Sequence, residues 1–445
     1  MAPSVSTATA APFDQQPTHN GKITKIINGR LLQNHAIVEG TYLWFQDGKF
    51  IHPQSTFFDA QREPDEIIDA KGLLVVPGYV DIQINGAFGI DFSDSDGTPE
   101  KLAKDIQKVA KGLFQYGCTS FCPTVVSSFS ETYNKVLPLL RPRPGSVQDG
   151  AEILGAHIEG PFISKEKKGA HKVETFRTAK RGMAEFDDCY GPELQNTHGT
   201  IRIITVAPEL EGVRACIPEL VKRNMTVSIG HSASKIAQAE EAIAGGATCI
   251  THLFNAMQAF HHRDPGIIGV LGSTHLPIPT PETKRHPSPS SSSPSPKNPD
   301  PRPFYGVICD GIHVHPNSVK IAYYSHPSGA ILVTDAMSAM GLPSGNHSLG
   351  GLDVVVDDLN RVYIRGTDTL AGSAITMDAC VKNFVKFTSC TIVEALEAAT
   401  LHPAQLLGIA DKKGTLNVGG DADFLFLSDD LSVQRVFVGG EEVRL

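Results

Sequence analysis

The middle of the chain contains eight short apolar runs, and amphipathic stretches separate most of them. The apolar runs lie at 79–84, 118–123, 153–159, 202–207, 225–230, 248–253, 305–310 and 331–336. Their nearly continuous apolar character is typical of parallel strands that are buried on both faces. The stretches at 99–117 and 232–246 have the apolar spacing of helices. This β-then-α order predicts a (β/α)8 barrel. A doubly wound open sheet is the alternative, but no Gly-rich phosphate-binding sequence follows the first run.

Both ends of the chain show a different pattern, in which short β-like runs alternate with turn residues. One such region spans 20–76, where Asp47 and Gly48 are a hairpin signal, and the other spans 411–445. We expect these two regions to form one small β-sheet domain together. The barrel is then expected to span 77–410 and to end in helices at about 374–409.

Two segments are too polar or too rich in proline to pack a core. Residues 1–19 are small and polar and are expected to form a disordered tail. The segment 274–303 contains ten prolines and six serines, so we expect a disordered insert between the sixth and seventh strands.

Composition limits the classes of partner. The chain has 39 Lys and Arg against 48 Asp and Glu, and the net charge of −9 argues against bulk attraction to nucleic acid or an anionic membrane. A small anionic ligand needs only one or two local cations. The eight cysteines are scattered, so we expect free thiols in a reducing compartment. The first residues show no secretory pattern, and no apolar run reaches transmembrane length, so we expect a cytoplasmic protein.

Polar residues at the ends of the predicted strands are the candidates for chemistry, because active sites of such barrels form at the C-terminal strand ends. In strand order they are Asp81, Gln83, Asn85, His157, Glu159, His231, His252, Asn255, Asp310, His313 and Asp335. One glutamate and two histidines with an open position are typical of a catalytic metal site, so Glu159, His231 and His252 are the candidate ligands. Asp335 is the candidate general base for an attacking water.

Each candidate also has a structural interpretation. A single histidine at a strand end is more often a packed, hydrogen-bonded residue, and a single Asp or Glu often caps the next helix. Capping alone does not explain the three candidate ligands and the candidate base at four different strand ends, so we interpret those four as functional. The pattern does not decide between structural and functional roles for Asp81, His157 and Asp310.

Eight motifs occur in an order and spacing that resemble a known family. They are PGYVDIQING, HIEGPF, KKGAH, GHS, THLFNAM, DGIHV, VTDAM and LAGSA. They resemble the N-acetylglucosamine-6-phosphate deacetylases of the amidohydrolase superfamily, from about residue 23 to the C-terminus apart from the Pro/Ser-rich segment. The first motif is common to many amidohydrolases, whereas THLFNAM, HIEGP and DGIHV are much more specific to this branch. The resemblance implies a metal-bearing barrel with a small β-sandwich made from both chain ends.

The resemblance also implies roles at the matching positions. It places the metal triad on Glu159, His231 and His252 and the catalytic aspartate on Asp335. His171 is the candidate for holding the carbonyl or the developing oxyanion. The implied hexosamine-binding residues are Ala170, His171, Asn255, Ala256, Arg263, His313, Leu370, Ala371 and Gly372. Of these, Arg263 and His313 are the expected phosphate partners.

The implied reaction is metal-dependent hydrolysis of N-acetyl-D-glucosamine 6-phosphate to D-glucosamine 6-phosphate and acetate, in amino-sugar catabolism. Many amidohydrolases hold two metals and carry His-x-His at the end of the first strand. Here those positions are Asp81 and Gln83, and glutamine is a poor ligand, so we expect one divalent ion per subunit. Zinc is the first expectation, with iron, manganese and cobalt as alternatives.

The resemblance further implies a homodimer, in which the loop that carries Arg263 serves the neighbouring subunit's site. A different amidohydrolase reaction and a non-catalytic barrel are the rival interpretations. Metal analysis together with an acetate-release assay separates all three.

Overall fold

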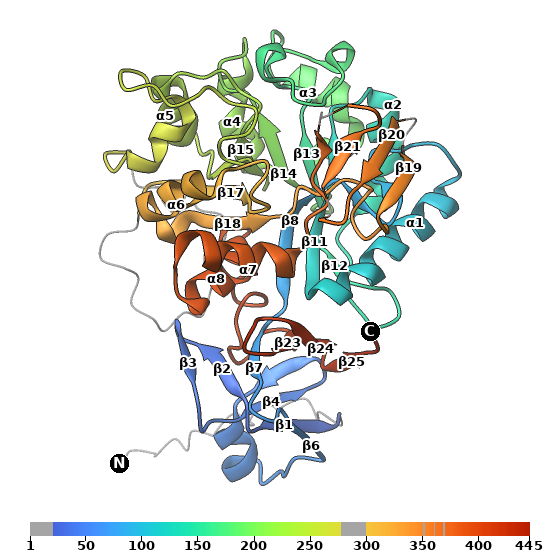
Figure 1. The fold of residues 1–445 in the computed structure, drawn as a ribbon, viewed down its shortest axis with the longest axis vertical. Coiled ribbons are helices and arrows are strands. Elements are labelled where there is room, and N and C mark those ends of the chain that lie inside the picture. The colour runs from blue at the N-terminus through green and yellow to red at the C-terminus, as the bar shows by residue number, and fades with distance from the viewer. Residues whose placement is uncertain (1–20, 277–299, 350–351, 360, 368–369) are drawn as a thin grey trace, which may run out of the picture.

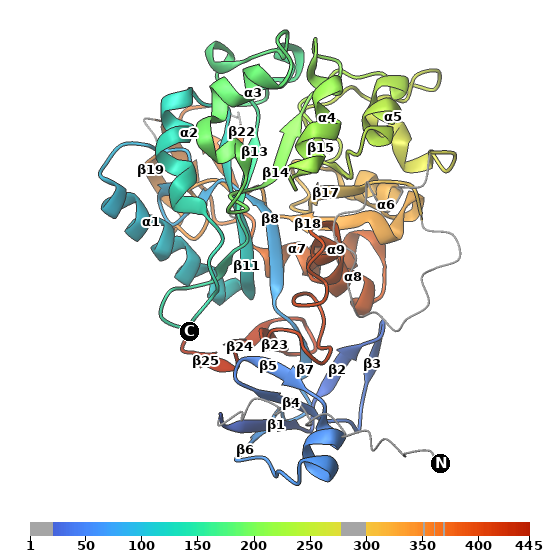
Figure 2. The ribbon, with the colours of Figure 1, turned by 180° about the vertical axis from the view of Figure 1, so that it is seen from behind.

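The computed structural model describes residues 21–276, 300–349, 352–359, 361–367 and 370–445. The chain forms a barrel with a smaller β domain at one end, and strands from both chain termini lie together in that domain (Figures 1 and 2). The tail predicted at 1–19 and most of the insert predicted at 274–303 lie outside the described residues. The described edges of that insert pack on the barrel, because Leu276 is buried and the Arg302 guanidinium donates to the backbone oxygens of Leu271 and Ser325.

The predicted eight-stranded parallel barrel is confirmed. Its strands, each paired with the next, are β8 (Tyr79–Ile84), β11 (Cys118–Val126), β13 (Ala156–Glu159), β14 (Ile201–Val206), β15 (Thr226–Ile229), β16 (Cys249–Ile250), β17 (Phe304–Ile308) and β18 (Ala330–Val333). The short strand β12 (Glu152–Ile153) also pairs with β11. The last and first strands meet where the Asp335 amide donates to the Gln83 oxygen at 2.8 Å and the Asn85 amide donates to the Ala336 oxygen at 2.8 Å.

Helices cover the outside of the barrel, as the amphipathic stretches predicted. The α-helices are α1 (Pro99–Gly112), α2 (Ser130–Val136), α3 (Met183–Tyr190), α4 (Val213–Lys222), α5 (Ile236–Ala244), α6 (Pro316–Ser325), α7 (Met377–Thr388), α8 (Ile392–Ala399) and α9 (Leu401–Leu406). Shorter helical turns are η1 (Ser55–Asp59), η2 (Leu113–Tyr116), η3 (Leu137–Leu140), η4 (Lys165–Lys167), η5 (Val173–Thr175), η6 (Gly191–Gln195), η7 (Gly266–Gly272) and η8 (Pro327–Gly329).

Helix α1 shows why these stretches are helical. Thr98 caps its first turn by accepting from the Lys101 amide at 3.3 Å, Pro99 fits its first position, and Leu102, Ile106 and Val109 bury one face. No helix in the described part of the chain is long and apolar enough to cross a membrane.

The small domain is a β-sandwich built from both chain ends, as predicted. One sheet holds β5 (Lys49–Ile51), β4 (Leu43–Gln46), β1 (Ile23–Ile27) and β6 (Glu66–Asp69). The other holds β25 (Glu441–Val443), β24 (Val433–Val438), β23 (Phe424–Leu427), β7 (Leu74–Pro77), β2 (Arg30–Gln33) and β3 (Ala36–Val38). Buried phenylalanines fill the space between the sheets, and the rings of Phe424 and Phe437 stack with centroids 4.4 Å apart.

One further sheet was not predicted. It contains β19 (Gly345–Leu349), β20 (Leu352–Val356), β21 (Val362–Ile364) and β22 (Leu370–Gly372), all antiparallel. A short hairpin of β9 (Gly86–Ala87) and β10 (Ile90–Asp91) follows β8. The end of β22 runs beside the end of β18, since Ala336 bridges Ser373 and the Met337 amide donates to the Ser373 oxygen at 2.8 Å. The extra sheet therefore lies at the C-terminal ends of the barrel strands.

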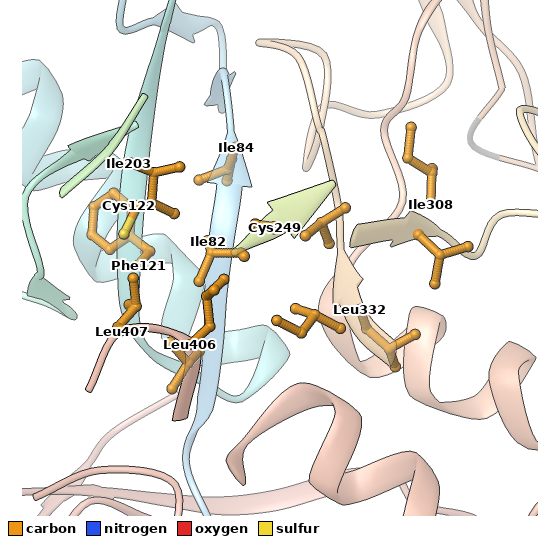
Figure 3. Close-up of a cluster of buried hydrophobic side chains, with 14 of the residues drawn as sticks. Ile82, Ile84, Phe121, Cys122, Ile203, Cys249, Ile308, Leu332, Leu406 and Leu407 are labelled. Atoms are coloured by element: carbon orange, nitrogen blue, oxygen red, sulfur yellow. The ribbon is translucent and has the colours of Figure 1, made fainter. Parts of the chain in front are cut away.

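The barrel is filled by apolar side chains. Figure 3 shows Ile82 and Ile84 of β8 near Phe121 and Cys122 of β11 and Ile203 of β14. Burial raises the pKa of the Cys122 thiol to about 12, which keeps it protonated, and the described cysteines are free, as expected. This packed interior gives the polar residues at the strand ends a rigid support.

Candidate metal centre and active site

Glu159, His231 and His252 meet at the C-terminal ends of three strands, as predicted. Glu159 is the last residue of β13, His231 follows β15 and His252 follows β16. The His231 and His252 Nε2 atoms lie 3.2 and 3.0 Å from Glu159 Oε1, and 3.0 Å from each other. The three side chains are buried. The structure thus brings together three atoms that could ligate a metal and that are far apart in the sequence.

The spacing of these atoms fits a small divalent ion. Ligand atoms about 2.0–2.2 Å from a tetrahedral zinc lie roughly 3.3–3.5 Å from one another. The observed separations of 3.0–3.2 Å are close to that arrangement. Two imidazole nitrogens and one carboxylate oxygen are also the donor set of many catalytic sites with an open position.

Hydrogen bonds fix how the ring of His231 is presented. Its Nδ1 lies 2.8 Å from the Lys167 carbonyl oxygen, which can only accept, so Nδ1 carries the proton and Nε2 is left as the ligand atom. His231 and His252 have φ of 45° and 25°, a region that residues other than glycine adopt rarely. Such backbone strain is common at functional sites.

The electrostatics of the triad favour a cation. Burial alone would raise the pKa of Glu159, but its contacts with the His231 and His252 rings hold that pKa well below its usual range. Burial alone would lower the pKa of His252, but the hydrogen bond and charge of Glu159 raise it to about 9. The carboxylate therefore stays ionised and attracts positive charge, and a bound metal would replace a proton there.

Asp335 lies next to this centre. The side-chain amides of Gln83 in β8 and of Asn85 just after β8 hold its carboxylate. Its Oδ1 accepts from Asn85 Nδ2 at 2.8 Å and from Gln83 Nε2 at 3.2 Å, and Gln83 Nε2 also donates to Glu159 Oε1 at 3.0 Å. Burial and the nearby charge of Glu159 raise the pKa of Asp335. With Oδ1 occupied by two donors, Oδ2 is the oxygen left for proton transfer.

His171 lies at the edge of the triad. Its Nε2 is 3.8 Å from Glu159 Oε2, and its ring contacts the His231 ring at a centroid distance of 4.4 Å. The Ser127 amide donates to His171 Nδ1 at 3.2 Å, so the proton of the neutral ring is on Nε2. Burial lowers the pKa of His171 to about 4, which keeps the ring neutral.

Three of the predicted sugar-binding residues line one cavity. His313, Leu370 and Gly372 face a cavity of about 130 Å³ that Arg361 and Asn383 also line. His313 Nδ1 lies 2.5 Å from Asp310 Oδ2, and Asp310 Oδ1 accepts from the Ile312 and His313 amides at 2.8 Å each. Burial alone would lower the pKa of His313, but the hydrogen bond to Asp310 outweighs this effect and raises the pKa above its usual value. Asp310 thus orients His313 and favours its charged form.

Of the other predicted binding residues, three lie in loops that adjoin the triad residues or His171, and Ala371 lies in β22. Asn255 and Ala256 follow His252, and the Asn255 Nδ2 atom is buried without a hydrogen-bond partner among the described residues. Ala170 precedes His171 and is exposed, and Ala371 is half-buried in β22.

Arg263, the other predicted phosphate partner, shows no side-chain contact with the predicted site residues within the described part of the chain. It is exposed, and we find no ion pair of its side chain within the described residues. The carboxylate of Asp264 instead accepts from the Ile236 and Gly266 amides at 3.0 and 3.3 Å. No ion pair between Arg263 and the neighbouring Asp264 is found among the described residues.

Asp81 and His157, whose roles the sequence pattern did not decide, make hydrogen bonds within the barrel. Asp81 Oδ2 accepts from the Thr334 hydroxyl at 2.5 Å, and His157 lies 3.0 Å from the Ile82 oxygen and 2.7 Å from the Thr205 hydroxyl. Both support the strands that carry the site.

Sequence reasoning missed several groups that hold the site residues. Ser127 sets the tautomer of His171, the Lys167 oxygen sets that of His231, and Glu209 binds the turn after His231. A backbone oxygen leaves no trace in a sequence, and a serine in an apolar run carries little signal. Gln83 and Asn85 belong to the first motif, but the sequence does not indicate their shared contact with Asp335.

A second acidic group lies away from the centre. Glu152, Asp421 and Asp423 lie close together, but Lys413 Nζ is 2.5, 2.9 and 2.5 Å from their carboxylates. The Lys413 ammonium lies among the three carboxylates and offsets part of their charge, and this cluster joins the barrel to the small domain.

Comparisons with known proteins agree with this geometry. Residues 74–443 match the family model described as the Amidohydrolase family. The chain is 45% identical over 422 residues to the N-acetylglucosamine-6-phosphate deacetylase of Danio rerio, covering 95% of this chain and 96% of that protein. It is 43% identical to the human protein of the same name, covering 96% and 97%. The crystal structure of N-acetylglucosamine-6-phosphate deacetylase from Pasteurella multocida superposes with a TM-score of 0.75 at 27% identity, covering 94% of this chain and 99% of that one.

Proposed function

Because this chain belongs to the amidohydrolase family, and within it to the N-acetylglucosamine-6-phosphate deacetylases, we propose that it hydrolyses N-acetyl-D-glucosamine 6-phosphate to D-glucosamine 6-phosphate and acetate. This reaction belongs to amino-sugar catabolism. The observation that carries the proposal is the meeting of Glu159, His231 and His252 beside the buried carboxylate of Asp335. That arrangement supplies a metal site and a base, which are the two requirements for hydrolysing an unreactive amide with water.

One divalent ion per subunit is the proposed cofactor, held by Glu159, His231 and His252. Zinc is the first candidate, with iron, manganese and cobalt as alternatives; when bound, such an ion would make water more acidic and would polarise a carbonyl group. Support for a single ion comes from Gln83, whose Nε2 donates to both Glu159 and Asp335. Because that amide presents N–H groups rather than lone pairs, it repels a second cation at this point.

Asp335 is the proposed general base and acid. Its Oδ2 takes a proton from the attacking water and then passes it to the nitrogen of the leaving amine. The amides of Gln83 and Asn85 hold Oδ1, which fixes the direction of Oδ2 during both transfers. The raised pKa of Asp335 suits this role, because it brings the base closer to neutral pH.

His171 is the proposed donor to the acetyl oxygen. The His171 ring is neutral, and the contacts of Nδ1 with Ser127 leave its proton on Nε2. Nε2–H can therefore donate a hydrogen bond without giving up its proton. The buried, unpaired Nδ2 of Asn255 supports a role of the 255–256 loop in binding the sugar phosphate. Ala170, Ala256, Leu370, Ala371 and Gly372 are proposed to contact the hexosamine through backbone groups and apolar surface.

The phosphate is proposed to bind His313 and Arg263. The contact with Asp310 favours the charged form of His313, which suits a phosphate oxygen. Arg263 is exposed on its own chain. We propose a homodimer in which Arg263 completes the site of the neighbouring subunit. The buried free thiols support a cytoplasmic, reducing location, and we propose neither a nucleic-acid nor a membrane partner.

The direct test is acetate release from N-acetyl-D-glucosamine 6-phosphate, measured beside unphosphorylated N-acetyl-D-glucosamine. We expect kcat/KM to be at least tenfold higher for the phosphorylated sugar, because only it engages the charged contacts. Acetate release from neither sugar, in protein that carries its metal, would overturn the proposed function. A preference for the unphosphorylated sugar would overturn the phosphate assignment alone.

A further inference from the structure

Glu209 lies in the loop between β14 and α4 and binds the turn that presents His231. We propose that Glu209 is a positioning residue of the metal centre, which fixes His231 in its ligand geometry without touching the metal or the substrate. This inference rests on the proposed metal site but concerns a residue outside the ligand set.

The carboxylate of Glu209 is held by the three residues that follow His231. Oε1 accepts from the Ala233 amide at 2.6 Å, and Oε2 accepts from the hydroxyls of Ser232 and Ser234 at 2.6 and 2.8 Å. Both serines are fully buried, and Glu209 is half-buried. Three short hydrogen bonds to one carboxylate are stronger than bonds between neutral groups, so the turn has little freedom.

This turn needs external support, because His231 has a left-handed backbone conformation with φ of 45°. A residue other than glycine stays in that region only where its surroundings enforce it. On one side, the Ser164 amide donates to the His231 oxygen at 2.8 Å and the Lys167 oxygen holds Nδ1. On the other side, Glu209 binds the next three residues. Contacts to His231 itself and contacts to the three residues after it therefore both hold this histidine in place.

The same turn is joined to the loop after β16, which carries the other histidine ligand. The Ser232 amide donates to the Ala256 oxygen at 3.1 Å, and Gln258 Nε2 donates to the Ala233 oxygen at 3.0 Å. The Glu209 carboxylate therefore ties the loop after β14 to the turn after β15, and the backbone of that turn is in turn bonded to the loop after β16. Loss of Glu209 would leave two buried hydroxyls and an amide without this acceptor.

The test is zinc binding by the full-length protein, stripped with a chelator and titrated against a zinc indicator. Glu209→Ala should weaken the zinc Kd by about 10- to 100-fold, the usual effect of losing a partner that orients a ligand. Glu209→Gln should recover much of the affinity, because its oxygen can accept from Ala233 and its amide can donate to the serine hydroxyls. Glu211→Ala is the matched control, since Glu211 is two residues away, 68% exposed and paired only loosely with Lys180 at 3.6 Å. It should keep the wild-type Kd.

A purely structural role would lower the melting temperature of Glu209→Ala without changing its zinc affinity. Folded Glu209→Ala with the wild-type Kd would therefore overturn the inference. If that variant does not fold, Ser234→Ala decides, because it removes one donor and keeps the carboxylate. It should weaken zinc binding at least about threefold, and an unchanged Kd would overturn the inference. Failure of the wild-type protein to bind zinc would instead refute the proposed metal site, so the two failures are distinguishable.

Discussion

Replacement of Asp335 by asparagine separates the chemistry of this site from its architecture. The Asn85 and Gln83 amides donate to Asp335 Oδ1 at 2.8 and 3.2 Å, and an asparagine oxygen can accept both bonds. The nitrogen of the new side chain then takes the place of Oδ2, where it cannot accept a proton from water. Asp335→Asn therefore preserves size and support while it removes the proposed base.

The expected loss of rate follows from that single missing proton transfer. A positioned general base contributes about 10²- to 10⁴-fold, which corresponds to roughly 2.7–5.5 kcal/mol of activation free energy. We expect kcat to fall by about 10² or more, with KM within a few-fold of the wild type, because no proposed sugar contact is removed. In the wild type, activity should decline as the pH falls through the raised pKa of Asp335, because the base becomes protonated.

Asp335→Asn should lower the rate but should not lower the stability of the metal-free protein. A buried carboxyl whose folded-state pKa is raised stabilises the fold below its unfolded pKa, and that stability is lost as the pH rises through the folded-state value. Asparagine removes this pH-dependent cost, so metal-free Asp335→Asn should melt no lower than the wild type at pH 8. The assay combines acetate release with thermal melting of the metal-free protein. Near-normal kcat in the variant would refute the role of Asp335, and a large drop in melting temperature would show that the side chain is mainly structural.

Three other perturbations test separate parts of the account. His231→Ala or His252→Ala should lose the divalent ion and the activity together, and full metal content in a folded variant would remove that residue from the ligand set. Arg263→Ala should lower kcat/KM for the phosphorylated sugar about ten- to hundredfold, the effect of losing one charge-assisted contact, and barely change that for the free sugar; equal losses would make Arg263 structural. Replacement of residues 277–299 by a short Gly/Ser linker should leave the melting temperature nearly unchanged, because loop length adds little closure cost, whereas a large drop would show that the segment stabilises the fold.

The fold was predictable because its signals are periodic. Eight apolar runs placed all eight barrel strands, and the strand at 79–84 agrees with the structure at both ends. The run at 248–253 yields only the two-residue strand β16, since the chain turns away at His252, where φ is 25°. The sheet of β19 to β22 was missed because its strands are only three to five residues long, although the three valines at 354–356 in β20 and the turn-rich sequence around the strands were usable signals.

The site was predictable to the extent that its residues end strands. Barrel topology alone brings Glu159, His231 and His252 to one rim, so the sequence could indicate their convergence. It could not indicate that Ser127 sets the tautomer of His171, since that contact depends on the path of a loop. Nor could it show that Asp264 binds the Ile236 amide and leaves Arg263 unpaired among the described residues. Contacts between loops depend on local geometry that apolar periodicity does not encode.

The measurement that tests the central claim most directly is a metal titration of activity. Metal-free protein is titrated with zinc while acetate release from N-acetyl-D-glucosamine 6-phosphate is followed. The account predicts negligible activity without metal and a linear rise that saturates at about one equivalent per chain, the content of a single three-ligand site. Full activity in metal-free protein, or a rise that saturates only at two equivalents, would contradict a single-metal centre built from Glu159, His231 and His252.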